Sequence, residues 1–252
     1  NGLILADDAD PAEAAAATEA FTAALVSFGY PPCPGGIMAN QPLWRQTVTG
    51  FRQTFGRWIY DEPTEGMGEG PMNLAIFMDA LAVAGDARLL DEAKGHMQRL
   101  MSDSDAYLAR FAASVNSFSD DRSWWTRLPG MRGRASAEID LKKLGLFPIV
   151  QGVRALALKY RVPALATTER LAALVAAGRV PEGMARDLTD ALHFLMGAKL
   201  DNNLAQIAQG RTPDNLIRLE DMGTLDRQAL KDSLGIVRDF RDWLSQQFRL
   251  ST

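Results

Sequence analysis

The sequence has few of the residues that build disulfide frameworks and metal clusters. Cys33 is its only cysteine, which excludes disulfides within the chain and zinc sites that use several cysteines. Its two histidines, His96 and His193, lie far apart and do not predict a histidine metal cluster. Because no histidine is near it in sequence, Cys33 is predicted to be a small buried residue and not a nucleophile.

The sequence also lacks an excess of basic residues and a long apolar run. Its 27 basic and 31 acidic side chains give a net charge of −4, so we expect no nucleic-acid surface and no polybasic membrane anchor. No apolar stretch is long enough to span a bilayer, and no signal peptide is recognisable. Hydrophobic residues make up 47%, as in ordinary globular proteins. We therefore expect a cytoplasmic protein without a membrane partner.

The first hundred residues alternate between strand-like and helix-like patterns. The chain opens on an apolar strand at residues 3–5, and a helix follows from Pro11 to Phe28, capped by Asp8 or Asp10. A second helix is predicted from about Pro42, since five apolar residues then recur at steps of three and four: Trp44, Val48, Phe51, Phe55 and Trp58.

Two connections and one ambiguous run complete this part. Residues 31–36, PPCPGG, predict a rigid loop, and residues 61–71 a surface connection. The apolar run at 73–86 is compatible with a strand or with a buried helix.

Helical periodicity dominates from about residue 86 onward. The predicted helices cover roughly 86–100, 103–118, 147–160, 167–177, 184–209 and 222–249. Short links between successive helices are typical of an antiparallel bundle. The sequence thus predicts a mixed part at residues 1–100 and a helical bundle at residues 101–252.

Several stretches, taken together and in this order, resemble one bacterial family. They are NGLILADD (1–8), CPGGIMANQPLWRQ (33–46), IFMDALAVAGD (76–86), AEIDLKKLGLFPIVQGVRALAL (137–158), TTERLAALVAAGRV (167–180), GRTPDNLI (210–217) and LDRQALKDSLGIVRDF (225–240). The family comprises nucleotidyltransferases related to PII-protein uridylyltransferase, whose members often carry upstream CBS and cyclic-nucleotide-binding domains. The resemblance covers almost the whole chain.

The resemblance implies a fold and an activity. The fold is α+β and mostly helical, with an incomplete nucleotidyltransferase-type α/β domain followed by an antiparallel helical, substrate-binding-like bundle. The activity is magnesium-dependent transfer of a nucleotidyl group from a nucleoside triphosphate to an acceptor, for example a PII-type protein. In the family, a glycine-serine turn and an Asp-x-Asp pair precede the asparagine that is Asn1 here. That pair would bind two magnesium ions, so this chain alone is expected to be inactive.

Asp79 is the candidate catalytic residue and metal ligand. A carboxylate inside an apolar run is costly unless it is paired or binds a cation. The resemblance implies a third metal-binding carboxylate on a later strand, and Asp79 could fill that role. The alternative is an Asp that caps a helix or forms a salt bridge. Leu81 stands where the family usually has an arginine, which would alter a phosphate contact.

The loop with Gly35, Gly36 and Asn40 is a candidate nucleotide-binding segment. Its glycines would let the backbone approach a nucleotide, and the Asn40 side chain could bond a base or a ribose. The structural alternative is a loop that leads into a helix, where asparagine is favoured anyway.

Asp140, Lys142 and Arg154 form the second candidate binding group. If Asp140 and Lys142 share one face of an extended segment, both could meet substrate, and a lysine beside a phosphate is chemically sensible. The alternative is that Asp140 and Lys142 pair with bundle residues such as Arg154.

Two functions from different classes remain at this point. The first is the nucleotidyltransferase, with a nucleoside triphosphate and a protein acceptor as partners. The second is a non-catalytic regulatory or partner-binding module in signal transduction, which Leu81 favours modestly. An all-helical adaptor would leave the opening strand unexplained, and a homodimer is left open.

Overall fold

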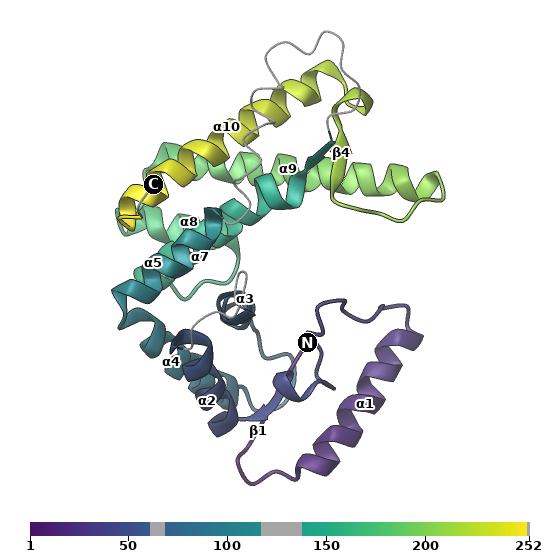
Figure 1. Ribbon diagram of the computed structural model, residues 1–252, viewed down its shortest axis with the longest axis vertical. Coiled ribbons are helices and arrows are strands. Elements are labelled where there is room, and N and C mark those ends of the chain that lie inside the picture. The colour runs from purple at the N-terminus through teal and green to yellow at the C-terminus, as the bar shows by residue number, and fades with distance from the viewer. Residues whose placement is uncertain (61–68, 117–137, 251–252) are drawn as a thin grey trace. The chain divides into compact units, whose positions relative to one another are not determined.

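The computed structural model describes residues 1–60, 69–116 and 138–250, and it confirms a mostly helical α+β fold. The contacts between residues divide the chain into two compact units, Asn1–Asp103 and Ser104–Thr252 (Figure 1). Each unit is built around its own helices and strands.

Unit 1 contains two short strands and four α-helices among its described residues. They are β1 (Leu3–Leu5), α1 (Pro11–Ser27), a 3-10 helix (Pro42–Trp44), β2 (Arg45–Thr47), α2 (Val48–Tyr60), α3 (Glu69–Met78) and α4 (Ala87–Ser102). The strands β1 and β2 pair in parallel, with Leu3 opposite Arg45 and Leu5 opposite Thr47. Asp10 caps α1, because its Oδ1 accepts a hydrogen bond from the Ala12 N–H at 2.8 Å. Of the two caps that the sequence allows, the structure uses Asp10.

The helix predicted from about Pro42 is wrong in its first turn and a half. Residues 42–44 form a 3-10 helix, residues 45–47 form β2, and α2 begins only at Val48. The backbone of residues 45–47 pairs with β1, and this pairing overrides the helical spacing of the apolar residues. Trp44 is nevertheless buried, so the periodicity identified a core residue correctly but not its conformation.

The apolar run at 73–86 is a helix followed by a segment without regular structure. Helix α3 ends at Met78, Asp79 lies in the turn that follows, and residues 80–83 have no regular structure. Leu74, Phe77 and Met78 are buried, as expected for one face of a helix.

Aromatic side chains form the core of unit 1. Phe55 is fully buried, and its ring lies 4.8 Å from that of Phe77 and 5.8 Å from that of Phe51, centroid to centroid. Such pairs stabilise a core beyond the area they bury. Helix α2 thereby packs against α3, and it also contacts α4.

Asp7, which follows β1, caps the neighbouring helix α2. Its Oδ1 accepts a hydrogen bond from the Thr49 N–H at 3.0 Å, and its Oδ2 accepts one from the Thr49 hydroxyl at 2.6 Å. These bonds, the side-chain one first, hold the pKa of Asp7 below its usual value of 3.8. The opening strand is thus tied to α2 by a carboxylate whose ionised form these bonds favour.

We predict that Asp7→Asn flattens the dependence of stability on pH in the acid range. The folded state lowers the pKa, so the ionised carboxylate contributes stability above the usual value of 3.8, and this contribution is lost as the pH falls through the folded pKa. Urea unfolding of both proteins between pH 6 and about pH 3 tests this. Asp8→Asn, next to it on the surface, is the control, and parallel curves for wild type and Asp7→Asn would contradict the assignment.

Unit 2 contains the predicted helices and a small antiparallel sheet. The elements are α5 (Asp105–Ala113), a 3-10 helix (Ser114–Asn116), β3 (Glu138–Asp140), a π-helix (Lys142–Leu146), α7 (Phe147–Lys159), α8 (Thr167–Ala176), α9 (Glu182–Ala208), β4 (Leu216–Arg218), a 3-10 helix (Leu219–Asp221) and α10 (Thr224–Gln247). The bounds of these helices agree with the sequence prediction to within a few residues. Residues 117–118, at the end of the helix predicted at 103–118, lie outside the described residues. In the parts of the chain that the structure describes, no helix combines the length and apolarity needed to cross a membrane.

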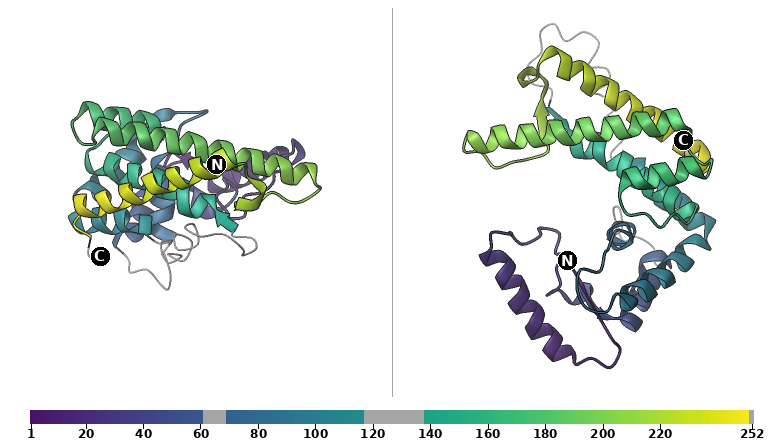
Figure 2. Two further views of the ribbon diagram at one scale, coloured as in Figure 1. Left: turned by 90° about the horizontal axis from the view of Figure 1, so that it is seen from above. Right: turned by 180° about the vertical axis from the view of Figure 1, so that it is seen from behind.

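Helix α7 is the central element of unit 2. Most of its side chains are buried, and it contacts α5, α8 and α10. Helices α9 and α10 pack along each other, as both views in Figure 2 show. The strands β3 and β4 pair with Glu138 opposite Arg218 and Asp140 opposite Leu216. The sheet thus joins the stretch before α7 to the stretch between α9 and α10.

Candidate functional site

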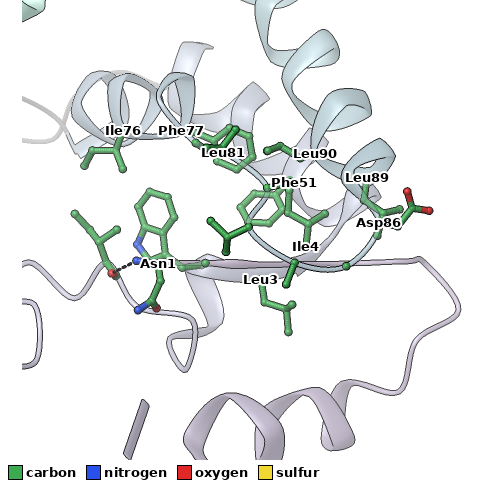
Figure 3. A pocket seen from close by; sticks show the side chains of 18 residues that line it. Asn1, Leu3, Ile4, Phe51, Ile76, Phe77, Leu81, Asp86, Leu89 and Leu90 are labelled. Atoms are coloured by element: carbon green, nitrogen blue, oxygen red, sulfur yellow. Dashed lines mark hydrogen bonds between the residues drawn. The ribbon is translucent and has the colours of Figure 1, made fainter. Parts of the chain in front are cut away.

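Unit 1 contains a cavity of about 430 Å³ beside β1 (Figure 3). Its walls come from the start of the chain, from α2, and from the segment that links α3 to α4. The lining residues are Asn1, Gly2, Leu3, Ile4, Ile37, Trp44, Phe51, Ile76, Phe77, Ala80, Leu81, Ala82, Val83, Ala84, Gly85, Asp86, Leu89 and Leu90. Most of these side chains are apolar, as is usual for ligand pockets.

The ends of the cavity are held by polar contacts. At one end, the Asn1 side-chain oxygen accepts a hydrogen bond from the Ala39 N–H at 2.7 Å, which ties the glycine loop to β1. At the other end, Asp86 caps α4 by accepting from the Arg88 N–H at 3.0 Å, and it forms a salt bridge with the Arg88 side chain. The carboxylate of Asp86 is therefore already used by the fold.

Asp79 lies directly before the part of the chain that lines the cavity. It is half-buried in the turn after α3, and its N–H donates to the Ile76 carbonyl at 3.2 Å. The next residue, Ala80, lines the cavity, and its carbonyl accepts a hydrogen bond from the Lys94 ammonium at 2.9 Å. The structure thus places Asp79 in a turn, where the resemblance implies a strand.

The loop with Gly35 and Gly36 reaches the same cavity through Ile37. Gly36 has a φ of +66°, which favours glycine, and its N–H donates to the Cys33 carbonyl at 2.9 Å in a tight turn. Asn40 is not at the start of an α-helix, and its amide donates to Glu19 at 3.2 Å. The Asn40 side-chain oxygen is buried and finds no hydrogen-bond partner among the described residues.

Cys33 is exposed, so the prediction that it is buried is wrong. The rigid loop of prolines and glycines around it keeps the side chain at the surface. Backbone N–H groups of Ile37 and Gly35 bond the sulfur and lower the pKa of the thiol.

In unit 2, Asp140 and Lys142 do not lie on one extended segment. Strand β3 ends at Asp140, and Lys142 is the first residue of a π-helix. The Asp140 carboxylate accepts from the Lys143 N–H at 2.9 Å and lies 3.8 Å from the Lys143 ammonium. Lys142 is exposed. The structure therefore gives Asp140 a role at the start of a helical turn, and it leaves Lys142 accessible to solvent.

Arg154 is half-buried on α7, and one of its guanidinium nitrogens lies 3.4 Å from the Gln151 side-chain oxygen. Gln151 in turn donates to the Ser114 hydroxyl at 3.1 Å. The structure thus connects Arg154 to a polar group inside the bundle.

The GRTPDNLI stretch folds around one side-chain pair. Gln206 on α9 donates to the Asp214 carboxylate, and the Asp214 N–H donates to the Gln206 side-chain oxygen, both at 2.9 Å. Gly210, with a φ of +70°, ends α9 just before this turn. The reciprocal bonds fix the start of β4 against α9.

Among the described residues, no three His, Cys, Asp or Glu side chains lie close enough to hold a metal ion. The described residues therefore supply at most a part of the magnesium site that the resemblance implies. The sequence assigns Asp79 to that site as one ligand, and this stays a prediction.

The sequence reasoning missed the apolar walls of the cavity. Phe51 and Trp44 were expected as helix-face residues only, and Leu89 and Leu90 were not singled out. Apolar side chains next to a strand edge carry no chemical signature in sequence.

Comparison with protein families identifies both units. Residues 105–248 match the family model described as "Putative nucleotidyltransferase substrate binding domain". Residues 1–65 match the one described as "Putative nucleotidyltransferase DUF294". The chain belongs to this nucleotidyltransferase family. A comparison with curated proteins found no match.

The two family matches assign a type of domain to each unit. Unit 1 carries the match to the nucleotidyltransferase domain, and its cavity, with Asp79 beside it, falls in that unit. Unit 2 carries the match to the substrate-binding domain, together with Asp140, Lys142 and Arg154.

Proposed function

We propose that this chain is part of an enzyme that transfers a nucleotidyl group from a nucleoside triphosphate to an acceptor, with Mg²⁺ as cofactor. The acceptor that the sequence resemblance implies is a PII-type signalling protein. The matches of both units to nucleotidyltransferase families support the reaction class.

The observation that carries the proposal is that Asn1 and Ala80 line one cavity. The resemblance puts the Asp-x-Asp pair immediately before the residue that is Asn1 here. Asp79, immediately before Ala80, would then lie near that pair and supply a third carboxylate, of the oxygen type that Mg²⁺ prefers. The glycine loop, tied to Asn1 through Ala39, would lie on the nucleotide side of the same cavity.

In unit 2, the exposed Lys142 is the residue we assign to a phosphate group. An ammonium is a mobile point charge that suits a phosphate oxygen. Asp140 fixes the helical turn that begins at Lys142. Arg154 lies on the next helix, α7. We assign both residues to the positioning of Lys142 rather than to contact with the substrate.

Because the described residues supply no set of three metal-binding side chains, we expect no turnover from this chain by itself. Detectable transfer by the isolated chain would refute this expectation.

The test is calorimetric titration of Mg-UTP and Mg-ATP into the full-length polypeptide. We expect binding with a dissociation constant between about 1 µM and 1 mM, the usual range for enzyme substrates. Replacing Mg²⁺ by a chelator is expected to weaken it at least about tenfold. If a folded full-length protein binds neither nucleotide, the enzyme assignment fails.

The alternative function is a regulatory module that binds a partner without catalysis. Leu81, in the position where the family usually has an arginine, favours it, since a leucine side chain offers a phosphate no charge. In that case the titration shows no nucleotide binding, and a full-length PII-type protein binds without being modified.

A further inference from the structure

Two arginines of unit 2 hold a backbone conformation that favours glycine. Arg161, just after α7, has a φ of +54°, and Arg249, just after α10, has a φ of +51°. Each closes the end of its helix in the same way: the Arg161 N–H donates to the Leu158 carbonyl at 3.2 Å, and the Arg249 N–H donates to the Gln246 carbonyl at 3.3 Å. A residue with a Cβ is strained in this left-handed conformation, so both arginines cost the fold some stability.

The same turn is made by glycine elsewhere in the chain. Gly29 after α1, Gly178 after α8 and Gly210 after α9 have φ values of +93°, +66° and +70°, and each N–H donates to the carbonyl three residues before it. Glycine therefore makes this turn in this protein without strain. An arginine after α7 and after α10 adds strain and a positive charge, so the charge is the feature that calls for a function.

The two arginines lie at the same end of unit 2. The ammonium of Lys159, the last residue of α7, donates to the Gln247 carbonyl at the end of α10, at 2.8 Å. The same ammonium lies 4.7 Å from the centre of the Phe248 ring. Arg161 is two residues beyond Lys159, and Arg249 is two residues beyond Gln247. The contact between the two helix ends thus brings the two arginines close together.

A third arginine reaches this place from the link between α8 and α9. The guanidinium carbon of Arg179 lies 4.8 Å from the centre of the Tyr160 ring, and the Lys159 ammonium lies 5.6 Å from the same centre. We call Lys159, Arg161, Arg179 and Arg249 the basic cluster, and its three arginines are exposed. The described contacts of Lys159 and Arg179 are with a carbonyl oxygen and with aromatic rings, so no described carboxylate neutralises these two charges.

The surroundings of the basic cluster limit the kind of anion that fits it. Asp242 on α10 is exposed and lies seven residues before Arg249, about 10 Å along the helix. The whole chain has a net charge of −4. A long nucleic acid needs a basic surface that continues along its phosphates, which this cluster does not offer. A short acidic peptide segment fits better, because each guanidinium can hold a carboxylate through two parallel hydrogen bonds.

We propose that the basic cluster is a docking site for an acidic segment of a partner protein. Arg161, Arg179 and Arg249 bind carboxylates of the segment, and Lys159 holds the ends of α7 and α10 together. The inference goes beyond the proposed function and does not depend on it, since docking involves neither nucleotide nor Mg²⁺.

Fluorescence anisotropy with a labelled peptide of alternating Asp and Glu tests the docking site. The full-length protein is used at low ionic strength and without nucleotide. We expect saturable binding, which the double variant Arg161→Gln/Arg249→Gln weakens about tenfold or more because two charged contacts are lost. Arg227→Gln, which removes an exposed arginine from the first turn of α10, is the matched control and is expected to change the affinity about twofold or less.

Three results of this experiment would overturn the proposal. The first is a protein that does not bind the peptide. The second is equal weakening by the double variant and by Arg227→Gln, which would mean attraction to charge at no particular place. The third is a single-stranded oligonucleotide of the same charge that binds the basic cluster more tightly than the peptide, because the partner would then be a nucleic acid.

Arg249→Gly gives a second readout that a purely structural arginine would not produce. Glycine relieves the strain at positive φ, so the ratio of folded to unfolded protein, measured by urea unfolding, is expected to rise about threefold or more. The affinity for the peptide is expected to fall about threefold or more at the same time, since a charged contact is lost. If the substitution lowers stability or leaves it unchanged, Arg249 serves the fold and the proposal is overturned. Neither readout involves nucleotide, so its failure is distinguishable from failure of the titration.

Discussion

Replacement of Asp79 by asparagine is expected to lower the affinity of the full-length protein for Mg-nucleotide by about 100-fold, or about 2.7 kcal/mol. Asparagine keeps the size of the side chain and removes its negative charge. The charge matters because the proposed function makes this carboxylate a ligand of a cation, and carboxylate oxygens are ligands that Mg²⁺ prefers. The loss is expected only with Mg²⁺ present, so binding in chelator should be equally weak for both proteins.

Asp91→Asn is the matched control for this variant. Asp91 is an exposed residue of α4 in the same unit, so the substitution makes the same change in charge away from the cavity. It is expected to leave Mg-nucleotide affinity within about twofold. Thermal unfolding of the three proteins checks that Asp79→Asn still folds. An Asp79→Asn protein that binds Mg-nucleotide like wild type would remove Asp79 from the metal site.

The sequence predicted the helices of unit 2 well, because the apolar periodicity and the boundary residues indicate the same helices. Helix α10 shows this best: Ser233, Val237, Phe240 and Leu244 of the predicted stripe are all buried, whereas Leu225 in its first turn is exposed. In such helices local preference and tertiary packing favour the same conformation.

Prediction failed where backbone pairing decides between conformations. Residues 45–47 have helical spacing around them, but β1 needs a partner for its peptide groups, and so they form β2. The run at 73–86 allowed two readings because a short apolar run fits a buried helix and a strand equally well. Its division into α3 and the irregular segment that follows Asp79 depends on tertiary contacts that no local sequence pattern encodes.

The candidate site was predictable only in part for a related reason. Asp79 is a candidate from the sequence because a charge in an apolar run stands out, and its role stays a prediction. The cavity beside it depends on residues brought together from β1, α2 and α4, and their spacing in sequence reveals nothing of it. Asp7 was missed for the same reason, since its partner Thr49 is distant in sequence.

The stretches that carry the resemblance most specifically, 137–158 and 210–240, contact each other in unit 2. Strand β3 in the first pairs with β4 in the second. Helix α7 in the first packs on α10 through Gly152, whose place in the middle of a helix otherwise costs stability. The contact at Gly152 leads to the prediction with the largest expected effect on stability.

Gly152→Val is expected to destabilise the protein by about 3 kcal/mol or more. A Cβ at this position would lie 2.5 Å from Cε1 of Phe240 and 3.2 Å from Cδ2 of Leu244, and both of these side chains are buried. The ring has no free space to move into, so overpacking costs typically about 1–3 kcal/mol, and the two further carbons of valine add to it. The gain in helix propensity over glycine, below about 1 kcal/mol, is too small to offset this.

Gly235→Ala in α10 is the control that separates crowding from propensity. A Cβ there has no neighbour within 4 Å, so alanine is expected to stabilise the protein by about 0.5–1 kcal/mol. Urea unfolding, with hydrogen exchange of residues 147–159 and 224–247, measures both effects. If Phe240 is the obstacle, Phe240→Leu should cost less in the Gly152→Val background than in wild type, because the two substitutions then couple. Additive costs would mean that α7 and α10 do not pack through Gly152, and a stable Gly152→Val protein would mean the same.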